Sequence, residues 1–162
     1  MVAQIDSLYV KARPSRLWPR LLGYILFEGR PLTTKGRWFN PVVFGFARLL
    51  RTLPPIRRVK EPTFIVGTGR SGTTVLGIVL SMHRDVGFLN EPKALWSGLH
   101  PGEDLIGSYR TASARYRLSS TDATPAVIRG AHRIFGGFLG LGGVRRVVDK
   151  YPEMIFRTDF LR

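Results

Sequence analysis

Residues 67–74 (GTGRSGTT) combine glycines, hydroxyl side chains and one guanidinium in a single short segment. They follow the apolar, β-branched run 63–66 and precede apolar residues at helical spacing, so the local order is strand, loop, helix. Glycines let the backbone approach an anion closely, and the following helix directs its positive end at the same place. We therefore predict an oxyanion-binding loop. The residues expected to contact the anion are Gly69, Arg70, Ser71, Gly72, Thr73 and Thr74.

The loop differs from the nucleoside-triphosphate loop G-x-x-x-x-G-K-[ST], whose lysine reaches the terminal phosphates. Gly67 and Gly72 match the two glycines of that pattern. Thr73, however, stands in place of the lysine, and the cation has moved into the loop, at Arg70. A loop that holds one terminal phosphate and a neighbouring sulfuryl group needs only amides, hydroxyls and an arginine. A glycine-rich turn without a ligand and a true triphosphate loop are the alternatives.

A carboxylate follows the second predicted strand, residues 86–89. The C-terminal ends of parallel strands line the ligand crevice of an open α/β sheet. If strands 63–66 and 86–89 are neighbours, Glu91 faces the same cleft as Arg70. A carboxylate in that position can take the proton from an attacking hydroxyl. The alternatives for Glu91 are a surface turn residue or an ion pair with Lys93.

A third apolar run, residues 144–148, is followed by Asp149 and Lys150. Because Lys150 stands at the end of this predicted strand, we expect it to point into the same crevice. An ammonium there can stabilise negative charge on an oxygen as a bond breaks. The alternatives are a lysine in water or paired with Asp149. A kinase-like site would instead use Asp149 to bind Mg²⁺. His100 and His132 are further candidates for a base.

The elements that must position these residues alternate between strand and helix, which predicts an α/β domain with a parallel sheet. The expected strands are 63–66, 86–89 and 144–148, and the expected helices are 73–82, 126–139 and 152–161. Arg157 and Arg162 of the last predicted helix are further candidates for contact with the anion. Three other side chains belong either to the core or to a pocket for the acceptor: Leu95, Trp96 and Tyr109.

These motifs resemble the sulfotransferase family. Residues 70–74 after an apolar strand are similar to the loop with which that family binds the 5′-phosphosulfate of its donor, 3′-phosphoadenosine-5′-phosphosulfate. The segment 85–92 resembles the one that carries the glutamate base of carbohydrate and tyrosylprotein sulfotransferases, here Glu91, whereas the cytosolic branch uses a histidine. The segment 147–153 resembles the family's lysine segment, with Tyr151 in place of the usual threonine.

The resemblance implies a P-loop NTPase-like sulfotransferase fold over residues 61–162, in which helices flank a parallel sheet. It implies sulfuryl transfer from the donor to a hydroxyl of a sugar, lipid or small metabolite, with Glu91, Lys150 and Arg70 as catalytic residues and no metal. The family's second half, with an arginine and a serine on the 3′-phosphate, has no counterpart here, so we expect a truncated domain that lacks a C-terminal half. A non-catalytic anion-binding module and a P-loop kinase-like protein are the other functions left open.

Residues 1–60 form a basic, proline-containing extension in which the stretches 17–27 and 42–53 have apolar residues at helical spacing. Such helices dock on a domain or lie at a membrane surface. The chain has 25 Lys and Arg residues against 11 Asp and Glu residues, a formal net charge of +14 that favours anionic partners. It has no cysteine, which excludes disulfides and thiolate sites. No apolar run approaches the roughly 20 residues that cross a membrane, and no secretory signal is evident. We therefore expect a cytoplasmic protein, with residues 1–60 as a candidate for peripheral membrane contact.

Overall fold

A three-stranded parallel sheet forms the centre of the computed structural model, which describes residues 11, 13–30, 35–100 and 115–162. Its strands are β1 (Thr63–Ile65), β2 (Val86–Asn90) and β3 (Arg146–Lys150), in the order β1-β3-β2. The chain is α/β with a parallel sheet, as predicted. β1 and β2 are not neighbours, because β3 lies between them. The adjacency that would have brought Glu91 directly beside Arg70 is therefore absent.

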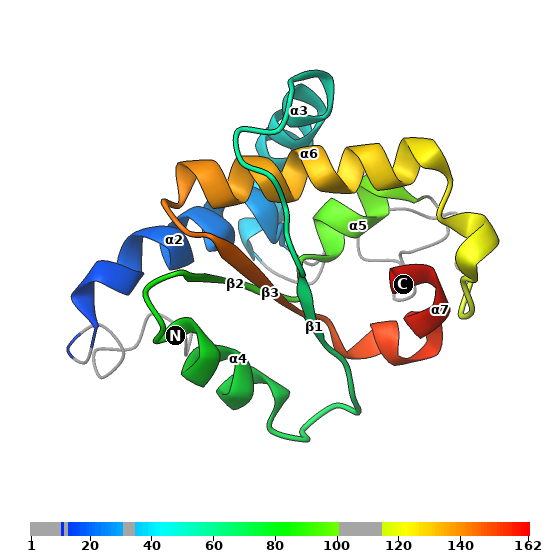
Figure 1. Cartoon of the computed structure of the whole chain (residues 1–162). Coiled ribbons are helices and arrows are strands. Elements are labelled where there is room, and N and C mark those ends of the chain that lie inside the picture. Colours follow the sequence, from blue (N-terminus) through cyan, green and yellow to red (C-terminus); the bar gives the residue numbers. More distant parts are fainter. Residues whose placement is uncertain (1–10, 12, 31–34, 101–114) are drawn as a thin grey trace.

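Helices cover both faces of the sheet (Figure 1). One face carries α4 (Thr73–Ser81), which follows β1. The other face carries α2 (Leu17–Leu22), α3 (Asn40–Thr52), α5 (Lys93–Leu99) and α6 (Pro125–Leu141). Beyond β3 the chain forms the 3₁₀ segment η7 (Pro152–Arg157) and then α7 (Thr158–Leu161). The remaining short segments are η2 (Pro14–Arg16), the π-helical η3 (Gly23–Phe27), η4 (Lys35–Phe39) and η6 (Ser120–Asp122). None of the helices in the described ranges is long and apolar enough to cross a membrane.

The predicted helices 73–82 and 126–139 are present with small shifts at their ends. The predicted helix 152–161 is instead divided into the 3₁₀ segment η7 and the short α7, because Arg157 between them has non-helical backbone angles. α6 begins at Pro125, and the Thr124 hydroxyl caps it by accepting a hydrogen bond from the Val127 N–H at 3.4 Å. The third strand begins later than predicted, because Val144 is buried in the turn after α6 and both Arg145 and Arg146 donate their N–H groups to the Asp85 carbonyl. α5 was not predicted, since it is short and nearly all buried, and it therefore lacks an amphipathic period.

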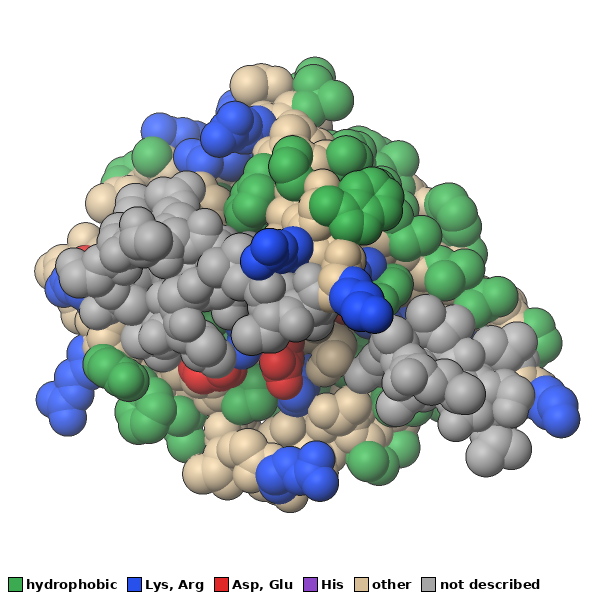
Figure 2. Space-filling view, turned by 180° about the vertical axis from the view of Figure 1, so that it is seen from behind, with side chains coloured by type: hydrophobic (Ala, Val, Ile, Leu, Met, Phe, Trp, Pro, Cys, Tyr) green, Lys and Arg blue, Asp and Glu red, His purple; other side chains and the backbone are tan. Residues whose placement is uncertain are grey.

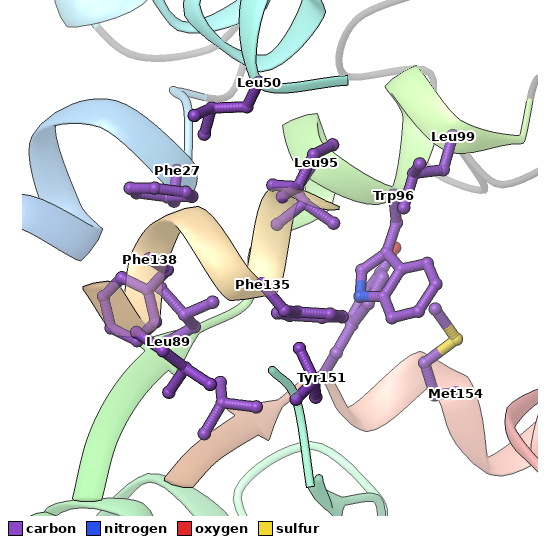
Figure 3. Packing of buried hydrophobic residues seen from close by; sticks show 14 of the residues in the cluster. Phe27, Leu50, Leu89, Leu95, Trp96, Leu99, Phe135, Phe138, Tyr151 and Met154 are labelled. Atoms are coloured by element: carbon purple, nitrogen blue, oxygen red, sulfur yellow. The ribbon is translucent and has the colours of Figure 1, made fainter. Parts of the chain in front are cut away.

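The main core lies between the sheet and α6 (Figure 3). Phe27 of η3 meets Phe138 of α6 edge-on, with 5.2 Å between the ring centroids. At the other end of the cluster the Trp96 indole contacts Phe135 with 5.7 Å between centroids. The extension therefore shares its core with the sheet. On the opposite face α4 approaches β2 so closely that a Cβ at Gly77 would lie 2.2 Å from the Phe88 ring.

A buried ion pair joins the extension to β2. The Arg20 guanidinium binds the Glu28 carboxylate through two hydrogen bonds, one of which spans 2.6 Å from Nη2 to Oε2. Arg20 also donates to the Phe88 carbonyl at 3.0 Å, and Glu28 Oε1 accepts from the Asn90 N–H at 2.7 Å. The two side chains therefore satisfy the Phe88 carbonyl and the Asn90 N–H on the outer edge of β2, which would otherwise be open.

Candidate functional site

The sheet register places Ile65, Lys150 and Asn90 in one row at the C-terminal edge. The predicted loop follows Ile65, and Glu91 follows Asn90. The three predicted groups therefore leave the sheet at the same edge, with Lys150 in the middle. This is the edge at which parallel α/β sheets bind their ligands.

The loop is bent, and its residues 68–72 are exposed. Arg70 has φ of 66° and Gly72 has φ of 80°, both in the left-handed region. This conformation is uncommon for a residue with a side chain and costs about 1–2 kcal/mol. The Ser71 hydroxyl donates to the Thr68 carbonyl at 2.6 Å, which holds the turn in shape. Among the described residues, Arg70 has no hydrogen-bond or ion-pair partner, so its guanidinium is available to an anion.

Glu91 and Lys150 form the closest contact of the site. The Lys150 ammonium donates to Glu91 Oε1 at 2.5 Å, and the Glu91 N–H donates to the Lys150 carbonyl at 2.6 Å. Lys150 is buried, whereas the Glu91 side chain is 38% exposed. Glu91 has φ of 52°, so it too is held in the left-handed region. Lys150 is therefore neither in water nor paired with Asp149, the two alternatives that the sequence suggested.

Two residues that the sequence did not place in the site extend this ion pair. The Lys93 ammonium lies 2.7 Å from Glu153 Oε1 and 3.6 Å from Glu91 Oε2. Lys93 was considered only as a partner of Glu91, and Glu153 carries no motif that indicates a role. The four side chains form a charge-balanced row in the order Lys150, Glu91, Lys93 and Glu153.

The electrostatics of this row keep Glu91 ionised. Burial raises the pKa of the Glu91 carboxyl, but the hydrogen bond and charge of Lys150, together with Lys93, outweigh it and hold the pKa below its ordinary value. At neutral pH the group is a carboxylate that can accept a proton. Its basicity rises when Lys150 leaves it, because that pair is the main force that lowers the pKa.

Asp149 lies on the other face of β3, away from the loop. It is buried, and its Oδ2 accepts a hydrogen bond from the Trp96 indole N–H at 2.8 Å, while Oδ1 has no partner. Burial raises the pKa of Asp149 to about 7, with Glu28 adding to the effect and the Trp96 hydrogen bond opposing it. This position does not suit the kinase-like alternative, in which Asp149 would hold Mg²⁺ beside the loop.

Asp149→Asn is expected to remove a pH dependence of folding stability. The native pKa of Asp149, about 7, lies above its ordinary 3.8, so the folded state binds a proton that the unfolded state releases between these values. Stability therefore falls as pH rises through this window, by an amount on the order of 4 kcal/mol. Asparagine stays neutral and still accepts from Trp96. Urea unfolding across this pH range measures the free energy of unfolding of both proteins. The same dependence of that free energy on pH in the unaltered chain and in the variant would contradict the prediction.

The other candidate residues lie away from the Glu91–Lys150 pair. His100 lies 4.0 Å from Asp122 and contacts the Phe160 ring, and burial, partly opposed by Asp122, lowers the pKa of His100. His132 is exposed on α6. Arg157 is buried and donates to the carbonyls of Arg115 and Tyr116, so it holds the chain rather than facing solvent. Leu95 and Trp96 belong to the core, Arg162 is exposed, and Tyr109 lies outside the described residues.

An apolar pocket of about 410 Å³ lies between β1, α6 and α7, and Phe64, Phe135 and Phe160 are among its lining residues. Trp96 reaches it from α5, but none of the loop residues, Glu91 or Lys150 lines it. This pocket therefore belongs to the opposite face of the sheet from α4, and the candidate site is an open edge rather than an enclosed cavity.

Comparison of the chain with protein-family models, curated proteins and solved structures gives no significant match.

Proposed function

We propose that this chain is a sulfotransferase, or the N-terminal part of one, with a P-loop NTPase-like sulfotransferase fold. It transfers a sulfuryl group from 3′-phosphoadenosine-5′-phosphosulfate to a hydroxyl of a sugar, lipid or small metabolite. The observation that carries the proposal is the row at the sheet edge, where an exposed glycine-rich loop, a buried lysine and an ionised glutamate stand at the ends of three adjacent strands. Each of the three has a separate task in the transfer.

The loop holds the 5′-phosphate and the sulfuryl group of the donor. Its amides lie at the N-terminus of α4, where the helix dipole favours negative charge. Thr73 and Thr74 sit in the first turn of that helix and offer hydroxyls. Arg70 is exposed at the bend and supplies the charge that replaces the lysine of triphosphate loops.

Glu91 and Lys150 carry the chemical step. The acceptor oxygen attacks sulfur and gives its proton to Glu91, while the bond from sulfur to the bridging oxygen breaks and 3′-phosphoadenosine-5′-phosphate leaves. Lys150 stabilises the charge on that bridging oxygen. Movement of Lys150 from Glu91 toward the donor also raises the basicity of Glu91, so the base becomes strong only when the donor is bound.

A non-catalytic anion-binding module is the second candidate. The observation in its favour is the Glu91–Lys150 pair, because the carboxylate and the ammonium bind each other. The exposed loop is then the part of the site that is open to a ligand. Such a module binds a phosphate-bearing ligand but transfers nothing. Donor binding and sulfuryl transfer therefore have to be measured separately.

Titration with 3′-phosphoadenosine-5′-phosphate and with ATP, each with and without Mg²⁺, tests the proposal. We expect metal-independent binding of the first ligand. Arg70→Ala is expected to weaken it about tenfold, because one charge-assisted contact is lost. Arg70→Gly is expected to weaken it equally while raising stability by about 1 kcal/mol, since glycine adopts the left-handed angle freely.

Arg58→Ala is the matched control, because Arg58 is an exposed arginine outside the loop. This variant is expected to bind the ligand as the unaltered chain does. Binding of ATP only in the presence of Mg²⁺ would favour the kinase-like alternative. Equal affinity in the Arg58 and Arg70 variants would contradict the role given to the loop.

A further inference from the structure

The outer face of α3 carries an apolar stripe. Its exposed members lie on η4, on α3 and in the non-helical segment that follows α3, where Ile56 also packs against Gly140 of α6. Each is between 44% and 76% exposed. They are Trp38, Val42, Leu49, Leu53 and Ile56, and we call them the α3 stripe. The inner face of the same helix is used differently, because Val43 and Leu50 are buried. α3 therefore presents apolar side chains to solvent beside its packed face, because Val42 and Leu49 directly precede the buried Val43 and Leu50.

The segment that carries the α3 stripe has charged side chains of a single sign. Residues 35–60 contain seven Lys and Arg residues and no Asp or Glu. The exposed members include Lys35, Arg48, Arg58 and Lys60. In Figure 2 hydrophobic side chains cover much of the end of the molecule where α3 lies in Figure 1, and Lys and Arg side chains border them. A surface that joins an apolar stripe to exposed positive charge is complementary to an anionic, partly apolar partner.

Two other classes of partner fit this surface less well. A second copy of the chain would bring two such basic surfaces together, and their repulsion opposes that contact. Nucleic acid would neutralise the charge but would offer phosphates, not apolar groups, to the α3 stripe. An anionic bilayer is complementary to both the positive charge and the apolar stripe. Its headgroups attract lysine and arginine, and the boundary of its acyl chains accepts the apolar side chains.

We propose that the α3 stripe and its flanking basic residues bind the surface of an anionic lipid bilayer. The stripe enters the boundary between headgroups and acyl chains, about 5–10 Å deep as for other interfacial helices. Trp38, which is 76% exposed, sits at the headgroup level that tryptophan prefers. α3 and the 67–72 loop lie on opposite faces of the sheet (Figure 1), so a chain bound in this way keeps the loop open to water.

Flotation with vesicles tests the proposal directly. We expect the whole chain to float with vesicles of equimolar phosphatidylcholine and phosphatidylglycerol, and to bind pure phosphatidylcholine at least about tenfold more weakly. Added salt is expected to weaken the anionic binding. Replacing Leu49 and Leu53 together by glutamate is expected to lower the affinity for anionic vesicles at least about tenfold. Both side chains are exposed, so the fold is retained, and circular dichroism checks this.

A matched variant separates the α3 stripe from a general effect of charge. Val75 and Val79 on α4 are spaced like Leu49 and Leu53 and are 63% and 60% exposed, but they lie on the opposite face of the sheet. Replacing both by glutamate makes the same change of net charge and is expected to leave most of the vesicle binding intact. Equal loss in the two double variants would overturn the proposal.

Tryptophan fluorescence gives a second readout. In a Trp18→Phe background the emission comes from Trp38 and from the buried Trp96. We expect the emission to shift to the blue with anionic vesicles and to be quenched by brominated lipid. Unchanged emission overturns the proposal, as does self-association or RNA binding that depends on the α3 stripe without vesicle binding. The donor plays no part in these measurements, so their failure and the failure of the proposed function are distinguishable.

Discussion

Glu91→Gln is expected to lower the rate of sulfuryl transfer by about 10²–10⁴-fold, the usual contribution of a general base. Glutamine keeps the size of the side chain and its hydrogen-bond acceptor for Lys150, but it cannot take up the proton of the acceptor hydroxyl. Affinity for 3′-phosphoadenosine-5′-phosphate is expected to stay nearly unchanged, because the loop and not Glu91 holds the phosphate. Transfer of labelled sulfate and ligand titration measure the two quantities.

Glu61→Gln provides the control for this substitution. Like Glu91, Glu61 has a positive φ, of 45°, and an ion pair, in its case with Arg146 at 2.6 Å, but it lies before β1 and away from the C-terminal edge. Its replacement is expected to leave the transfer rate unchanged. Transfer that survives in the Glu91 variant would show that another group is the base.

Arg20→Met is expected to lower the free energy of unfolding by about 3–5 kcal/mol, because it leaves the Glu28 carboxylate buried and without its partner. The substitution also removes the hydrogen bond to the Phe88 carbonyl. Urea unfolding measures the loss. Combining it with Glu28→Gln is expected to recover part of the stability, since glutamine is neutral and still accepts from the Asn90 N–H.

The exposed pair of Arg146 and Glu61 is the comparison for this buried pair. The side chain of Arg146 is 54% exposed and that of Glu61 is 78% exposed, so water already screens their attraction. Arg146→Met is expected to cost less than about 1 kcal/mol. A similar loss for Arg20→Met and Arg146→Met would show that burial does not govern the contribution of Arg20.

Local patterns in the sequence predict most of the elements and the loop, because these depend on neighbouring residues. The order of glycines, hydroxyls and apolar residues around Arg70 indicates a strand, a turn and a helix, and the structure has all three. Proline and threonine at 124–125 likewise indicate the start of α6. α5 is the exception, since a helix buried on nearly every side has no polar face to mark its period.

Long-range features could not be predicted in the same way. The order β1-β3-β2 depends on how helices pack over the sheet, and no single segment encodes it. The partner of Lys150 is 59 positions away in the sequence, at Glu91. The pairing of Arg20 with Glu28 is close in sequence, but its function of satisfying β2 depends on the position of that strand. The sequence therefore predicts that the site residues share one edge of the sheet, whereas the strand order and the direct pairing of Glu91 with Lys150 require the three-dimensional structure.

The Arg20–Glu28 pair has a consequence for how this sheet joins others. The pair already occupies the Phe88 carbonyl and the Asn90 N–H on the outer side of β2, so a strand added there would have to displace a buried ion pair. The pair therefore opposes growth of the sheet at β2, whereas a sheet with both sides open could continue into a fibril.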